Sequence, residues 1–150
     1  MAQPRRIALM LDMDHLYRRH ADVFTGAQRY AQEQGWVSTI DEFADHTLSL
    51  CSRKTLPYDG VIARATGKLA QQAARLHLPV VNVWFTSPAW KLLPGIFPDW
   101  SNIGRLHAHH LFDQGLRRFA AITRKNDRAQ TTASLAFASV VKTSGCTCIT

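Results

Sequence analysis

Short runs of apolar residues alternate along this chain with longer stretches in which apolar residues recur every three or four positions. The clearest short run, residues 6–12, is apolar almost throughout and ends in an acid, which is typical of a central parallel strand buried on both faces. In residues 16–34 apolar side chains recur at helical spacing among Arg, Gln and Glu, and Gly35 closes the stretch. The pattern predicts a strand followed by a helix.

The same alternation continues along the rest of the chain. Further strands are predicted at 36–43, 58–64, 78–84, 117–123 and 146–150, and further helices at 44–50, 68–76, 103–114 and 131–144. Residues 86–100 contain three prolines and a glycine, so we expect a long loop after the carboxyl end of a strand. Alternating strands and helices predict an α/β fold: a doubly wound, mainly parallel sheet with helices on both faces.

Ligands of such sheets bind beyond the carboxyl ends of the strands, so the residues there are the first candidates for a site. They are Asp12, Asp14 and Tyr17 after the first strand, Arg64 after the third, Trp84 after the fourth, and Asp99 in the long loop. Acids and aromatic rings are the components of sugar sites, since carboxylates accept hydrogen bonds from adjacent hydroxyls and an aromatic face covers the C–H side of the ring. The alternative is that Trp84 and Trp100 are packing residues and the acids are solvated strand ends.

The segment Asp12-Met13-Asp14 also has the form of the first motif of haloacid-dehalogenase-like phosphatases, in which the first Asp attacks phosphorus and the second exchanges protons with the leaving group. Thr86 or Ser87 could supply the second motif and Lys91 the third. The acidic pair that completes the magnesium site of that family is absent, and Mg²⁺ would hold too few carboxylates. A phosphatase using Asp12 and Asp14 is therefore the alternative function.

Composition excludes several other classes. Lys and Arg exceed Asp and Glu by 18 − 11 = 7 among 150 residues, but the basic pairs are spread from Arg5-Arg6 to Arg124-Lys125, as expected of a solvated surface rather than a nucleic-acid site. The apolar runs are too short to cross a membrane and no signal-peptide core follows Met1. Three cysteines suit reduced thiols better than a disulfide framework. We expect a cytoplasmic protein.

No cofactor or metal site is indicated. The sequence has neither G-x-G-x-x-G nor G-x-x-x-x-G-K-[ST]. His107 and His110 share one helix face as a possible metal pair, but His110 follows Leu106 on the apolar stripe, and we interpret it as a packed, hydrogen-bonded histidine. Cys146 and Cys148 have no second pair of ligands nearby.

Four segments taken together carry a family resemblance. They are residues 7–12, Tyr58-Asp-Gly-Val-Ile-Ala-Arg64, Leu78-Pro-Val-Val-Asn-Val83, and Asp99-Trp-Ser-Asn-Ile-Gly-Arg-Leu-His-Ala-His-His-Leu111 continuing through Gly115 and Phe119-Ala-Ala. In order and spacing they resemble the periplasmic-binding-protein-like sensor domain of lac-repressor/galactose-repressor regulators. The xylose-responsive regulators, whose arabinose-regulator-type DNA-binding domain is C-terminal, show the most similar pattern. The resemblance covers nearly the whole chain.

This resemblance implies a sensor segment without catalysis. Proteins of the family bind a monosaccharide between two subdomains, form homodimers and control a DNA-binding module, which here would lie outside the chain. It implies that residues 1–125 form the N-terminal subdomain and that residues 126–150 begin a second one. Asp99 matches the acid that opens the D-x-x-x-I-G-R segment, and Asp12 and Asp14 lie where the family contacts its ligand. The effector expected is a pentose, with xylose the first candidate.

Overall fold

The structure is a computed structural model that describes residues 3–13 and 18–149, with backbone only for residues 18 and 19. Two of the candidate residues, Asp14 and Tyr17, lie outside the described part of the chain. The chain divides into two compact units, Met1–Phe97 and Pro98–Thr150. Each unit is described by itself below.

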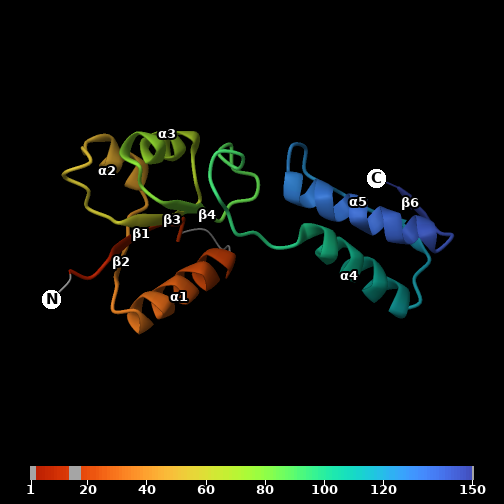
Figure 1. The fold of residues 1–150 in the computed structure, drawn as a ribbon. Coiled ribbons are helices and arrows are strands. Elements are labelled where there is room, and N and C mark those ends of the chain that lie inside the picture. Colours follow the sequence, from red (N-terminus) through yellow and green to blue (C-terminus); the bar gives the residue numbers. More distant parts are fainter. Residues whose placement is uncertain (1–2, 14–17, 150) are drawn as a thin grey trace. The chain divides into compact units, whose positions relative to one another are not determined.

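The first unit is a four-stranded parallel sheet covered on both faces. Its strands are β1 (Arg6–Met10), β2 (Val37–Ile40), β3 (Gly60–Ala63) and β4 (Val80–Asn82), in the order β2-β1-β3-β4. Helix α1 (Arg18–Glu33) lies on one face, and α2 (Ala44–Ser49) and α3 (Gly67–Leu76) lie on the other (Figure 1). The doubly wound α/β architecture expected from the sequence is confirmed.

The core of this unit follows from the alternation of side chains along the buried strands. Ala8 and Met10 of β1 belong to the cluster that includes Leu48 of α2 and Leu69 of α3. Leu9 is completely buried and, by the two-residue period of a strand, faces the side covered by α1. Because β1 is a central strand with helices on both faces, every one of its residues after Arg6 is apolar.

The outer edge of β4 is occupied by the loop that follows it. Asn82 N donates to Pro94 O over 2.8 Å, Ile96 N donates to Asn82 O over 3.0 Å, and Asn82 and Gly95 form an isolated parallel bridge. A Cβ at Gly95 would lie 2.8 Å from Asn82 O and would also collide with the Phe97 ring. Glycine is therefore what permits the loop to lie against this edge.

The second unit contains two helices and two short strands. These are α4 (Trp100–Asp113), β5 (Arg118–Ala120), α5 (Arg128–Thr143) and β6 (Thr147–Ile149). The strands pair in parallel, and α4 packs against α5. Their core consists of Ala108, Phe119, Phe137 and Val141. At the helix crossing the backbone of Gly104 lies so near Ala133 O that a Cβ would overlap it.

The division of the chain falls before α4, whereas the resemblance placed a subdomain boundary at residue 125. The reason is that α4 makes its main contacts with α5, so that α4 and β5 group with the residues that follow them. Strands β5 and β6 form a sheet of their own rather than extending the first one. The interpretation of residues 126–150 as the start of a larger subdomain stays a prediction.

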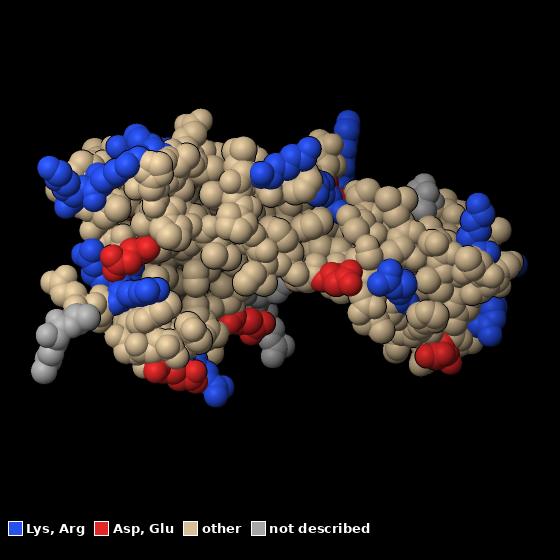
Figure 2. Space-filling view, in the orientation of Figure 1, with Lys and Arg blue, Asp and Glu red and all other residues tan. Residues whose placement is uncertain are grey.

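Charged side chains of both signs occur on the surfaces of both units. Figure 2 shows Lys and Arg side chains spread over both units on the visible face, with Asp and Glu among them. No helix within residues 3–13 and 18–149 is both long and apolar enough to cross a bilayer.

Candidate ligand-binding site

The carboxyl edge of the four-stranded sheet brings two of the candidate residues into contact. Arg64 directly follows β3 and Trp84 lies two residues beyond β4, on the neighbouring strand. The guanidinium carbon of Arg64 lies 3.9 Å from the centre of the Trp84 ring system. At this separation the guanidinium lies over the indole face, where the cation is attracted by the negative face of the ring.

The backbone of the strands fixes both members of this pair. Arg64 N donates to Met10 O over 2.9 Å, which extends the β1–β3 ladder by one residue. Val83 N donates to Ala63 O over 2.8 Å, so β4 remains paired with β3 up to the residue before Trp84. The backbone at Arg64, and the backbone up to the residue before Trp84, is therefore held by hydrogen bonds of the sheet.

Asn82, which was not among the candidate residues, fixes the backbone next to Arg64 and at Trp84 through its side-chain amide. Its side chain is fully buried. Asn82 Oδ1 accepts from Trp84 N at 2.9 Å and from Ala65 N at 3.2 Å, while Nδ2 donates to Trp84 O at 3.0 Å. One amide thus holds the segments after β3 and β4 together. The sequence signal was a polar residue inside the apolar run of residues 80–83, where a buried amide requires partners.

Ser87 makes a second buried link between the same segments. Its hydroxyl donates to Ala65 O over 2.6 Å and accepts from Ala89 N over 2.9 Å. The serine therefore joins the loop after β4 to the turn before α3. Ser87 was considered above as a phosphatase residue, and the structure gives its hydroxyl this structural role.

Asp12 lies at the same edge of the sheet, two residues beyond β1, and is half-buried. Its backbone carbonyl accepts from His20 Nδ1 of α1 at 2.6 Å. Because β1 is the neighbour of β3, Asp12 and Arg64 follow adjacent strands. A carboxylate acceptor and a guanidinium donor thus stand on one edge, which is the combination that ring hydroxyls require.

Asp99 belongs to the second unit and caps a helix. It is the residue before α4, and its Oδ1 accepts from Asn102 N over 2.8 Å. This is the usual arrangement of an acidic N-cap. Its proposed role as a ligand contact remains a prediction.

Asp41 follows β2, and its carboxylate accepts hydrogen bonds from three other residues of the first unit. Its carboxylate accepts from Phe43 N at 3.0 Å, Thr47 Oγ1 at 2.8 Å and the Tyr58 hydroxyl at 2.9 Å. Partial burial, together with this carboxylate as acceptor and neighbouring charge, raises the pKa of Tyr58 to about 12. Asp41 is thus a structural acid that ties β2, α2 and the segment before β3 together.

The other chemistries weighed from the sequence gain no support. No group of three or more His, Cys, Asp or Glu side chains placed to hold a metal occurs in the described residues. The interpretation of His110 as a packed residue is wrong: His107, His109 and His110 are all exposed on α4. Ala108, between them, is the residue that enters the core. Cys51, Cys146 and Cys148 are free thiols.

Neither any protein-family profile nor any curated protein sequence matches this chain. Solved structures do match it. A periplasmic binding protein/LacI transcriptional regulator from Alkaliphilus metalliredigens QYMF, complexed with D-xylulofuranose, is 16% identical over 97% of this chain and 55% of its own, with a TM-score of 0.69. The substrate-binding protein of a sugar ABC transport system from Bordetella parapertussis 12822 is 14% identical over 99% and 51%, with a TM-score of 0.73.

A putative LacI transcriptional regulator from Bacteroides fragilis is 12% identical over 98% of this chain and 59% of its own, with a TM-score of 0.61. At such identities the likeness establishes the fold. The chain therefore has the α/β fold of periplasmic-binding-protein-like proteins. It spans between 51% and 59% of the length of these three structures.

Proposed function

We propose that this chain is the ligand-sensing segment of a sugar-responsive transcriptional regulator and that it binds a monosaccharide at the carboxyl edge of the four-stranded sheet. The observation that carries the proposal is the Arg64 guanidinium stacked on Trp84 at that edge. The pair offers a fork of fixed N–H donors beside an aromatic surface. Asp12 adds acceptors on the adjacent strand.

The nature of the neighbours supports a sugar as the ligand. A protein of the same fold is described as a regulator in complex with D-xylulofuranose, and another belongs to a sugar transport system. A pentose, with xylose as first candidate, agrees with the resemblance of the four segments described above. The sensing role includes no catalysis, places the protein in the cytoplasm and requires a DNA-binding module outside this chain.

A titration of the 150-residue chain with D-xylose, followed by tryptophan fluorescence, tests the proposal. Because the chain spans little more than half of its neighbours' length, we expect weak, saturable binding, with a Kd on the order of millimolar. Replacing Arg64 by Ala removes charge-assisted hydrogen bonds and should raise that Kd by about tenfold or more.

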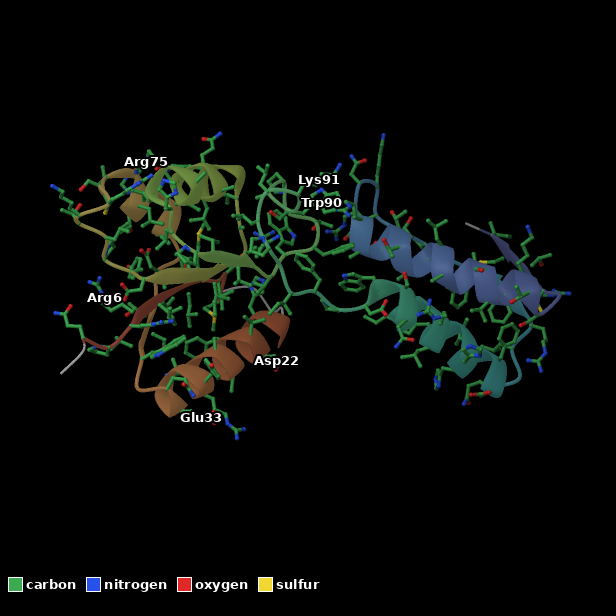
Figure 3. The ribbon with its side chains drawn as sticks, in the orientation of Figure 1. Arg6, Asp22, Glu33, Arg75, Trp90 and Lys91 are labelled. Carbon is green, nitrogen blue, oxygen red and sulfur yellow. The ribbon has the colours of Figure 1, made fainter. Side chains whose placement is uncertain are left out.

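The chain supplies a matched control for this substitution. Arg5 lies over the ring of Trp36, 5.3 Å from its centre, at the amino end of the same sheet. Figure 3 shows Arg6 of that end and Trp90 of the loop after β4 at opposite ends of the first unit. Arg5→Ala removes an equivalent cation and should leave the Kd unchanged. If folded chain gives no saturable response to D-xylose, D-xylulose, L-arabinose or D-ribose, the proposal fails.

A further inference from the structure

The Arg64 guanidinium covers one face of the Trp84 ring and leaves no room there for a sugar. The guanidinium carbon lies 3.9 Å from the centre of the ring system, which is the contact distance of two non-bonded groups. A sugar can stack on this face only if the guanidinium leaves it. An aromatic ring in a sugar site commonly covers the C–H side of the ligand, but on this face of the indole that position belongs to Arg64.

The guanidinium of Arg64 keeps its N–H donors available. In the part of the chain that the structure describes, it forms neither a hydrogen bond nor an ion pair, and its contact is with the Trp84 ring. The guanidinium of Arg75, in contrast, is committed to the protein, because it donates to Leu48 O over 2.8 Å and to Cys51 O over 3.0 Å. Arg64 is half-buried, so acceptors of a ligand can complete its hydrogen bonding.

The two side chains differ in how firmly the backbone fixes them. Asn82 Oδ1 accepts from Trp84 N, and Asn82 Nδ2 donates to Trp84 O, so both backbone groups of the tryptophan are held. An indole on such a backbone has little rotamer freedom left. Arginine has a long, flexible side chain that loses much freedom when it is ordered. The ring therefore restrains the guanidinium of Arg64 in a way that the backbone alone does not.

We infer that Trp84 is a positioning residue, which acts on the sugar through Arg64 and is not the surface on which the sugar stacks. The inference rests on the proposed function and specifies how the ligand is held. A donor that is ordered before the ligand arrives costs less to order on binding, so affinity rises without an additional contact to the sugar. The attraction between cation and ring requires an aromatic face, and it is strongest for tryptophan.

A double-mutant cycle tests the inference, with the Kd for D-xylose measured by NMR titration, which does not depend on the tryptophan that is replaced. Trp84→Leu should raise the Kd by about three- to tenfold, the affinity lost when one long side chain must be ordered on binding. In the Arg64→Ala background the same change should raise the Kd no further, because the group that Trp84 positions is gone. Equal fold-changes in the two backgrounds indicate direct contact with the sugar and overturn the inference.

Two further variants separate positioning from a general effect on the fold. Trp84→Phe retains an aromatic face and should recover most of the affinity that Trp84→Leu loses. Trp36→Leu is the matched control, because it removes the ring 5.3 Å from the Arg5 guanidinium carbon, at the amino end of the same sheet. It should leave the Kd unchanged. A Trp84→Phe chain that binds as weakly as Trp84→Leu, or a Trp36→Leu chain that loses the same affinity, overturns the inference.

A measurement without sugar tests the contact itself. The side-chain protons of Arg64 should be shielded by the ring current of Trp84 and should move downfield in the NMR spectrum of Trp84→Leu. Unchanged Arg64 shifts overturn the inference whether or not the chain binds sugar. If Arg64 is shielded but no sugar binds, the proposed function fails, and the role of Trp84 in it fails with it. If sugar binds and the effects of the two substitutions simply add, only the inference fails.

Discussion

The Tyr58 hydroxyl donates to Asp41 Oδ2 over 2.9 Å, and this hydrogen bond joins the segment that enters β3 to the turn that leaves β2. Thr47 of α2 donates to the same oxygen over 2.8 Å. The carboxylate thus connects three parts of the first unit that are separated in sequence. Removing the Tyr58 hydroxyl, one of the donors to this carboxylate, should therefore change the free energy of unfolding.

Tyr58→Phe should lower the free energy of unfolding by roughly 1–2 kcal/mol at pH 8, since one hydrogen bond to a charged acceptor is lost. The difference should depend on pH in a defined direction. The folded pKa of Tyr58 is raised to about 12 from 10.0, so its contribution is complete below pH 10 and is lost between pH 10 and 12, where only the unfolded chain releases the proton. Urea unfolding of both proteins at pH 8 and pH 11 checks this. A difference that grows with pH would contradict it.

Asn82→Ala should destabilise the first unit by roughly 2–4 kcal/mol, because it leaves the Ala65 and Trp84 amides without their acceptor in a buried position. The same change should weaken sugar binding, since Asn82 fixes the backbone on which Trp84 stands. Asn102→Ala, at an exposed position of α4, is the comparison. Thermal unfolding followed by circular dichroism measures both. Equal stability of the two variants would contradict a structural role for the Asn82 hydrogen bonds.

Two glycine substitutions should change stability in opposite directions. Gly104→Ala places a Cβ against Ala133 O at the α4–α5 crossing and should destabilise the second unit by roughly 1–3 kcal/mol. Gly26→Ala lies in the exposed middle of α1 with no atom within 4 Å of the new Cβ. It should stabilise the first unit by about 0.5–1 kcal/mol, as helix propensity alone predicts. Chemical denaturation of the two variants distinguishes packing from propensity.

A comparison of the two aspartates that cap helices, Asp99 and Asp127, can distinguish a structural role of Asp99 from a role in ligand binding. Asp99 Oδ1 accepts from Asn102 N at 2.8 Å, and Asp127 Oδ1 accepts from Gln130 N at 3.1 Å at the start of α5. Replacing either Asp by Ala should lower stability by roughly 1 kcal/mol. If Asp99 also contacts the sugar, only Asp99→Ala should raise the Kd for xylose. Equal Kd values for both variants would show that Asp99 caps α4 and does not contact the sugar.

Most of the fold could be predicted from the sequence because its strands are short apolar runs and its helices have a clear period. The errors at helix starts have one cause. Helices were predicted from 103 and 131, and they begin three residues earlier, at Trp100 and Arg128. Each starts directly after an aspartate that caps it, and the apolar period alone does not reveal the first turn.

The contacts at the candidate site depend on more than the order of the elements. Arg64 and Trp84 were chosen as candidates because strand ends share one edge, a rule that needs only the element order. Their direct stacking, and the support by Asn82, depend on the β3–β4 pairing and on how the backbone turns after each strand. The division of the chain at Pro98 results from the contact between α4 and α5, and helical periodicity alone does not identify the partner of an apolar stripe.

The loop that lies against β4 at Gly95 closes one side of the four-stranded sheet. An open sheet edge is a template on which a strand of another molecule can be added. Here the Asn82–Gly95 bridge occupies that edge from within the chain. A single glycine thus contributes to protection against aggregation, because it has no side chain to keep its backbone away from β4.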